Sequence, residues 1–273
     1  MVEFQIVSDL HLENPCAYDV FDIPAQAPHL ALLGDIGVVT DAGFFSFVEA
    51  QLRRFQVVFL LLGNHEPYHS SWDQTREKIC QFSESVYQRR SSQEGQPAAE
   101  RLGTFVFLDQ TRYDVSPDVT VLGCTLYSQV TTAHQERVSF GLNDFYYIDS
   151  WTVEDHNAAH AADLRWLNDQ VSHVATTEPQ RKIMILTHHS PITRDTRAVD
   201  PRHINSPLLS GFATDLSEQE CWRNPRVRLW GFGHTHFNTR FTEEGTGKQI
   251  VSNQRGYYFS QSIGFDPGMV VSI

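Results

Sequence analysis

Short apolar runs, each closed by glycine or by polar residues, recur along the whole chain. Runs of this kind are typical of strands that are buried on both faces of a sheet. The pattern predicts strands at residues 2–8, 29–33, 56–62, 182–187 and 227–230. Shorter β-type runs follow at 104–108, 111–115 and 119–124, and two or three closing strands are expected within 237–273.

Between these runs, apolar residues recur at helical spacing, and polar residues suited to helix caps precede them. One apolar stripe begins at Phe44. Ser71 followed by Gln74 resembles a capping box, and Thr152 with Asp155 gives a second capping signal. The predicted helices span about 41–54, 71–90, 152–174 and 207–221.

Strands that alternate with helices predict an α/β fold. The 273 residues suffice for one large domain of this class, and no internal repeat or composition break marks a linker. We therefore expect a single domain over residues 1–273. Residues 12–28 and 91–101 are expected to be loops, and 127–150 and 192–225 to be insertions near the substrate rim.

The net charge of −12 narrows the choice of partners. An acidic surface repels phosphate backbones, so nucleic-acid binding is disfavoured unless a local patch opposes the average. No stretch approaches the ~18 consecutive apolar residues of a membrane-spanning helix, and the first residues lack the features of a signal peptide. Four separated cysteines without a C-x-x-C pair are typical of free thiols in a reducing compartment. We expect a cytoplasmic protein with no membrane contact, and the sequence identifies no protein partner.

Five of the predicted strands end in residues that can bind metal ions. These residues are Asp9 with His11, Asp35, Asn64 with His65, His188, and His234 with His236. A lone Asp or His at such a place is usually a turn, cap or structural residue. Open α/β sheets, however, place their chemistry beyond the carboxyl ends of strands, where separate loops meet. The joint pattern therefore predicts one metal site.

The spacing within the pairs supports this interpretation. Asp9 and His11 are two residues apart, as are His234 and His236. In an extended backbone, side chains so spaced point the same way, so each pair can chelate one ion. A glycine precedes three of the five polar ends and lets the backbone turn sharply there.

As a set, these motifs resemble those of the calcineurin-like metallophosphoesterases. The matching motifs are Asp9-x-His11, Gly34-Asp35, Gly63-Asn64-His65-Glu66, His188 and Gly233-His234-x-His236. The resemblance implies a four-layer α/β/β/α sandwich of two mixed β-sheets flanked by helices. It also implies a binuclear metal centre and a metal-dependent hydrolase of phosphoester bonds, either a phosphatase or a phosphodiesterase.

The resemblance further assigns a role to each motif residue. The first ion would be held by Asp9, His11 and His236, and the second by Asn64, His188 and His234. Asp35 would bridge the two ions, and His65 would face the leaving-group oxygen without binding metal. Asp35 and His65 are thus the expected catalytic residues, and a metal-bound hydroxide would attack a phosphate mono- or diester.

The donor set and its charge are consistent with those roles. Two carboxylates, Asp9 and Asp35, against two dications leave about two positive charges, which suits a phosphate anion. Nitrogen and oxygen donors without sulfur fit Mn, Fe, Zn, Co or Ni. Of these, we expect Mn to support activity in vitro.

Further residues are candidates for contacts around the substrate. Arg255 can bind a phosphate through two hydrogen bonds or form a surface ion pair. Asn143 and Tyr146 belong to the polar and aromatic part of the first insertion. His189 lies either beside the ligands or in a structural position, and Glu66 either orients its loop or is a solvated turn acid.

Two other functions compete with the hydrolase. A nuclease would need a basic groove, which the arginines at 194, 197, 202, 223, 226 and 228 favour and the overall acidity opposes. A non-catalytic protein-binding scaffold would have lost metal ligands, but all seven expected ligand positions carry competent side chains. The H-x-H-x-D-H pattern of metallo-β-lactamase-type hydrolases is absent.

Overall fold

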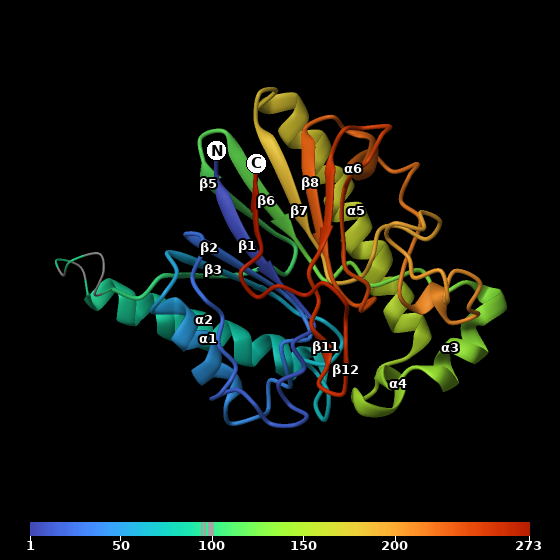
Figure 1. The fold of residues 1–273 in the computed structure, drawn as a ribbon, viewed down its shortest axis with the longest axis horizontal. Coiled ribbons are helices and arrows are strands. Elements are labelled where there is room, and N and C mark those ends of the chain that lie inside the picture. Colours follow the sequence, from blue (N-terminus) through green and yellow to red (C-terminus); the bar gives the residue numbers. More distant parts are fainter. Residues whose placement is uncertain (94, 96, 98–100) are drawn as a thin grey trace.

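Two β-sheets form the centre of the computed structural model, which describes residues 1–273 except 94, 96 and 98–100 (Figure 1). The first sheet contains β1 (Glu3–Val7), β2 (His29–Leu33), β3 (Val57–Leu61), β4 (Thr104–Phe107) and β13 (Val270–Ser272). The second contains β5 (Thr111–Ser116), β6 (Val119–Gly123), β7 (Lys182–Leu186), β8 (Val227–Phe232), β9 (Thr239–Thr242) and β10 (Gln249–Ser252). A separate hairpin pairs β11 (Gly256–Tyr257) with β12 (Ser260–Gln261).

Both sheets are mixed. The strand order is β13-β1-β2-β3-β4 in the first and β5-β6-β7-β8-β10-β9 in the second. Strands β1 to β4 are parallel, whereas β13 is antiparallel to β1. In the second sheet β6, β7, β8 and β10 are parallel, and the edge strands β5 and β9 are antiparallel. The carboxyl ends of the parallel strands in each sheet therefore lie at one edge.

Helices cover the outer face of each sheet. The long helices are α1 (Phe44–Leu52), α2 (Trp72–Ser92) and α5 (Val153–Thr177), and the short ones are α3 (Gln135–Gly141), α4 (Asp144–Tyr147) and α6 (Glu220–Arg223). Both predicted caps are present: Ser71 accepts a hydrogen bond from the Gln74 amide, and Thr152 with Asp155 forms a complete capping box.

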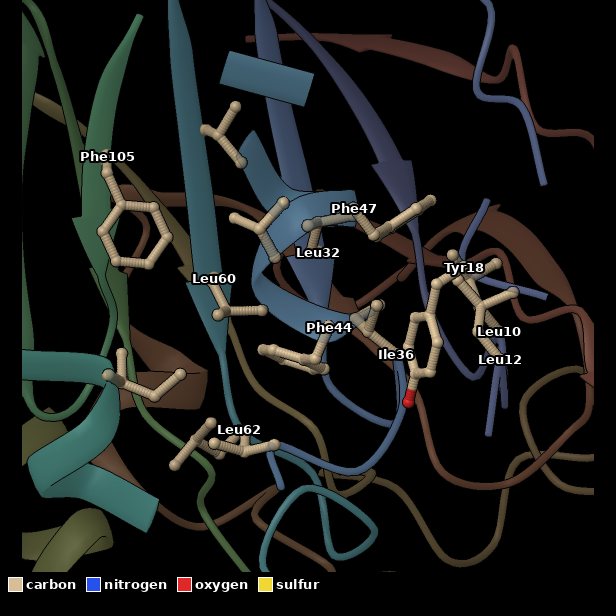
Figure 2. Packing of buried hydrophobic residues seen from close by; sticks show 14 of the residues in the cluster. Leu10, Leu12, Tyr18, Leu32, Ile36, Phe44, Phe47, Leu60, Leu62 and Phe105 are labelled. Carbon is tan, nitrogen blue, oxygen red and sulfur yellow. The ribbon is translucent and has the colours of Figure 1, made fainter. Parts of the chain in front are cut away.

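Alternate residues of the strands enter different cores, as expected for strands buried on both faces. Leu32 of β2 packs beneath α1, whereas Leu33 packs against the second sheet. Figure 2 shows Phe44 and Phe47 of α1 with Leu32 and Leu60 in the first of these cores. A third core joins β7 to α5 on the far side. The predicted four-layer α/β/β/α sandwich is confirmed.

Several boundaries differ from the predictions. Instead of one helix at 207–221, the structure has a 3₁₀ turn at Leu209–Gly211 and the four-residue α6. Tertiary bonds replace helical ones there: Ala213 bridges Ser190, and the Leu216 amide donates to the Pro191 carbonyl at 3.1 Å. The predicted loop 91–101 begins two residues late, because α2 ends at Ser92, and part of it lies outside the described residues.

Two segments contain more regular structure than expected. The 127–150 insertion holds a 3₁₀ turn at Thr132–His134, α3 and α4. The closing segment holds β9 to β13 rather than two or three strands, because β11 and β12 are too short to be recognised by pattern. The four cysteines are free thiols, as predicted. None of the helices in the described part of the chain combines the length and apolarity needed to cross a bilayer.

Candidate metal centre

The seven predicted ligands and the expected catalytic residue His65 follow the carboxyl ends of five parallel strands from both sheets. They are Asp9 and His11 after β1, Asp35 after β2, Asn64 and His65 after β3, His188 after β7, and His234 and His236 after β8. All are buried except His236, which is partly exposed. The structure brings these side chains together at one end of the two sheets.

One trio consists of Asp9, His11 and His236, whose candidate donor atoms all lie within 4.8 Å of one another. His236 Nε2 is 3.2 Å from Asp9 Oδ1 and 2.9 Å from His11 Nε2. Two imidazole nitrogens and a carboxylate oxygen that converge in this way form the kind of donor set that binds divalent first-row metals.

A second trio consists of Asp35, His188 and His234. Asn64 adds an oxygen, because its Oδ1 lies 3.1 Å from His188 Nε2. His188 Nδ1 lies 2.8 Å from the Leu33 carbonyl, and that hydrogen bond places the ring proton on Nδ1 when the imidazole is neutral. The Nε2 atom is then left free to bind a cation.

Asp35 belongs to the second trio and also faces the first. Its Oδ1 is 3.5 Å from His188 Nε2, and its Oδ2 is 4.0 Å from His11 Nε2. One carboxylate therefore presents one oxygen to each trio, which is the geometry needed to bridge two cations.

The chain reaches this arrangement through a backbone conformation that the spacing did not predict. Asp9, His11, His234 and His236 have φ angles of 52°, 47°, 68° and 49°, so neither pair is extended as expected. Asp35 has a φ of 52° and is left-handed as well. Such φ values are uncommon for non-glycine residues and cluster at functional sites. The premise of two extended pairs is wrong. Asp9 and His11 still share one trio, whereas His234 and His236 lie in different trios and do not chelate one ion as a pair.

Two glycines leave room for the ligands. A Cβ on Gly34, whose φ is +83°, would lie 2.6 Å from His188 Nδ1. A Cβ on Gly63 would overlap Asp35 Oδ1 and lie 2.6 Å from His188 Cε1. Any larger residue would displace a candidate ligand, so the close packing of the loops requires glycine at both places.

Carboxylates outside the predicted ligand set orient its members. Glu66 is fully buried and accepts hydrogen bonds from the amides of Asp35, Ile36 and Gly63 at 3.0, 2.8 and 2.7 Å. It therefore orients the ligand loops and is not a solvated turn acid. Asp144 accepts from Asn64 Nδ2 at 2.8 Å, which directs the Asn64 oxygen toward the second trio.

Glu13 is a further orienting residue that the sequence did not indicate. Its Oε1 is 2.8 Å from His65 Nδ1 and 3.3 Å from His11 Nδ1. Its only sequence signal is an acid two residues beyond His11, within a stretch predicted as a loop.

Burial and neighbouring charges shift the pKa values of the centre. Burial disfavours ionisation of Asp35, but the field of His188 and His65 outweighs it and holds the pKa of Asp35 well below its ordinary value. Burial and repulsion from His188 lower the pKa of His234 to about 3, so this imidazole is neutral. Burial lowers the pKa of His65, but Asp35 and Glu13 outweigh it and raise that pKa to about 9.

The residues present fit a pair of divalent cations. His234 Nε2 is buried and has no hydrogen-bond partner, as expected for a nitrogen whose partner is a cation. Burial lowers the pKa of His188, but the Asp35 carboxylate outweighs it and raises that pKa to about 10. A cation at the second trio would displace this proton.

Only one of the four residues expected to contact the substrate lines the open part of the site. A cavity of about 1030 Å³ opens beside the trios, and Asn143 lines it while Tyr146, Arg255 and His189 do not. Arg255 Nη1 donates to the Leu10 carbonyl at 2.8 Å, and its guanidinium stacks on Phe21. His189 is fully buried, with its ring centroid 4.2 Å from that of His234.

A family model of calcineurin-like phosphoesterases matches residues 4–238. The chain belongs to this family. An uncharacterised protein, L509, of Acanthamoeba polyphaga mimivirus is 26% identical over 289 aligned positions, which cover 98% of this chain and 95% of the viral protein.

Two solved structures share the fold. The phosphopantetheinyl hydrolase PptH of Mycobacterium tuberculosis superposes with a TM-score of 0.62 at 14% identity, covering 93% of this chain and 89% of that one. A dimetal phosphatase of Danio rerio gives a TM-score of 0.57 at 14% identity, covering 97% and 89%. At this level of identity the likeness concerns the fold.

Proposed function

We propose that the protein hydrolyses phosphate esters with the help of two divalent cations. The observation that supports this most directly is the position of Asp35, whose two carboxylate oxygens face separate trios of nitrogen and oxygen donors. Asp9, His11 and His236 would hold one cation, and Asn64, His188 and His234 the other. When bound, such a pair lowers the pKa of water and stabilises the attacking and leaving oxygens of phosphoryl transfer.

The side chain proposed to assist the leaving group is His65. Its Nδ1 donates to Glu13 Oε1, so its Nε2 is the atom that can serve a substrate in the cavity that His65 lines. His65 Nε2 lies 3.9 Å from Asp35 Oδ2, close to the bridge between the trios. A proton held on this nitrogen can pass to the oxygen of the departing alcohol, a contribution of roughly 10²–10⁴-fold in rate.

The nuclease alternative receives less support from the surface. Four of the six arginines that favoured it form ion pairs with carboxylates: Arg194 with Asp215, Arg197 with Asp195, Arg202 with Asp200 and Arg223 with Glu218. Their charges are therefore partly compensated. Measuring nucleic-acid binding against salt concentration separates the two functions, because a nuclease groove binds tightly at low salt.

The deciding experiment is removal and return of the metal. After chelation the protein should hydrolyse neither p-nitrophenyl phosphate nor bis(p-nitrophenyl) phosphate, and Mn²⁺ should restore activity on at least one of them. His65→Ala should keep the metal content and lose rate, most strongly on esters with poor leaving groups. Activity that survives complete removal of metal would refute the proposal, and a metal-loaded protein inert on all esters would favour the scaffold.

A further inference from the structure

The cavity beside the candidate metal centre has two chemically different walls. Its volume of about 1030 Å³ is that of a site for a large organic ligand rather than for a phosphate group alone. Asp35, Asn64, His65, His234 and His236 form its floor. A phosphate held over the trios would leave most of the cavity for the groups attached to it.

One wall is apolar and lies beside the second trio. Leu142, Leu208, Leu209 and Phe212 line this side of the cavity. The Phe212 ring stacks on His234, with the centroids 4.7 Å apart and the planes 24° from parallel. The apolar surface thus begins at a candidate ligand and continues away from it.

The other wall lies beside the first trio and carries hydroxyl and amide groups, with Tyr257 and Ile263 at its two ends. Ser260, Gln261 and Ser262 line it, at the end of the β11–β12 hairpin, together with Asn238. Tyr257 of this hairpin stacks on His11, with ring centroids 4.3 Å apart. In Figure 1 the hairpin and α4 lie at the same end of the molecule, where the cavity opens between them.

The cavity offers little fixed positive charge beyond the metal centre. Among its lining residues within the described chain, Arg202 is the only lysine or arginine. Its guanidinium is engaged by Asp200, with Nη2 2.6 Å from Oδ2 and Nε 2.9 Å from the same oxygen. A phosphate monoester is largely a dianion at neutral pH and is usually bound with the help of free arginine side chains, whereas a diester carries one charge.

We propose that the substrates are phosphodiesters with one large apolar arm and one polar arm, lying along the two walls. This inference rests on the proposed hydrolysis of phosphate esters. Water attacks phosphorus and releases a proton to solvent, the P–O bond to one arm breaks, and that arm leaves as an alcohol with a proton from His65, which then takes up a proton from solvent. The product retained on phosphorus is a monoester of the other arm. A monoester has a single arm and would contact only one of the two walls.

The first test compares p-nitrophenyl phosphate with the methyl, butyl and octyl p-nitrophenyl phosphodiesters, using the full chain loaded with Mn²⁺. The methyl diester should exceed the monoester in kcat/KM. A fully buried methylene is worth roughly fourfold, from about 0.8 kcal/mol. Partial burial along the wall should therefore still give the octyl diester an advantage over the methyl diester of at least about tenfold.

Matched variants test whether the preference for the octyl diester comes from the apolar wall. Leu209→Asn should reduce the octyl-to-methyl ratio by at least about fivefold, whereas Leu209→Met should preserve it, because only the first removes apolar contact. Val20→Asn is the control, since Val20 is 75% exposed and does not line the cavity. If Leu209→Asn fails to fold, Leu208→Asn serves instead, because Leu208 lines the same wall and is partly exposed.

A binding measurement provides a readout that is independent of turnover. Methyl(octyl)phosphinate has only P–C bonds and cannot be hydrolysed, and it should bind at least about tenfold more tightly than dimethylphosphinate. Leu209→Asn should reduce this difference in affinity. Faster hydrolysis of the monoester, or equal behaviour of the methyl and octyl compounds, would overturn this inference while leaving the proposed function intact. Failure to hydrolyse any ester would instead overturn the proposed function.

Discussion

Glu13 Oε1 lies 2.8 Å from Nδ1 of His65 and fixes the orientation of that ring. The same oxygen is 3.3 Å from His11 Nδ1, so one carboxylate links the proposed proton donor to a candidate ligand. Burial raises the pKa of Glu13, but the hydrogen bonds from the two histidines outweigh it and lower that pKa to about 2. Glu13 is thus an ionised acceptor throughout the ordinary pH range.

Glu13→Ala should therefore impair the reaction through His65. We expect a loss of roughly 10–100-fold in kcat on esters with poor leaving groups, the range typical of residues that orient an active group. Glu13→Gln, which keeps an acceptor oxygen, should recover part of the rate. In a His65→Ala background, Glu13→Ala should add little, because the ring it orients is gone.

A full additional loss in that double variant would show that Glu13 acts elsewhere, and elemental analysis of each variant would then test whether His11 has lost its cation.

Asp35→Asn should lower the occupancy of both cations together. The amide has one oxygen and no charge, so it cannot present an anionic oxygen to each trio. Elemental analysis after dialysis is the measurement, with Asp118→Asn, an exposed site outside the centre, as the control. Two metals bound at full occupancy in Asp35→Asn would contradict the bridging role.

Asp144→Ala should affect the second trio more than the first. Without Asp144 to accept from its Nδ2 atom, Asn64 is no longer held with its oxygen toward His188. Loss of such an orienting partner typically weakens metal binding by roughly 10–100-fold. Titration with Mn²⁺ should show a lower affinity at the second trio and a nearly unchanged affinity at the first.

Tyr68→Phe is the graded comparison for Asp144→Ala, because the Tyr68 hydroxyl donates to Asp144 at 2.8 Å and accepts from Asn64 Nδ2 at 3.2 Å. Asn64 keeps the Asp144 acceptor in this variant, so the second site should be weakened less than in Asp144→Ala. Equal weakening of both sites in Asp144→Ala would count against a specific effect on Asn64.

Lys248 should make stability depend on pH in a region remote from the metal centre. It is fully buried, with Nζ donating to Thr246 Oγ1 at 2.8 Å and lying over the Trp222 ring. Burial lowers the pKa of Lys248 from 10.5 to about 8. Between those values the unfolded chain holds a proton that the folded one has released, so the contribution of Lys248 to the free energy of unfolding should rise with pH, by up to about 1.4 kcal/mol per unit.

Denaturant unfolding at pH 7, 8, 9 and 10 would measure this contribution as the difference between the parent protein and Lys248→Met, because the raised pKa values of His65 and His188 act in the opposite direction in both proteins. Lys182→Met, at an exposed strand end, should keep the slope of the parent protein. A slope that is identical in all three proteins would exclude Lys248 as the titrating group.

The ends of strands could be located from sequence because apolar runs and polar terminators are local signals. The convergence of Asp9, Asp35 and His188 follows from strands whose carboxyl ends share one edge. The partners that orient these side chains were not accessible in the same way, since Glu13 is 52 residues from His65 and Asp144 is 80 residues from Asn64. Periodicity carries no information on such pairs.

Tertiary contacts also explain the other departures. At 207–221 the apolar spacing suggested a helix, but hydrogen bonds to Ser190 and Pro191 hold the chain in a different path. The left-handed backbone at Asp9 and His11 was not predicted because residue type alone rarely indicates it, and the two-residue spacing fitted a strand equally well.

Five candidate ligands occupy a region of backbone space that a residue with a Cβ ordinarily avoids. Each such residue costs of the order of 1 kcal/mol relative to relaxed chain. Hydrogen bonds such as those that Glu66 accepts offset part of this cost, and bound cations would offset more, so the loops that follow the strands are where a demetallated molecule should begin to open. Amide hydrogen exchange at these left-handed residues should therefore be faster in the metal-free protein than in the metal-loaded protein, and its rate would report whether the ions are bound.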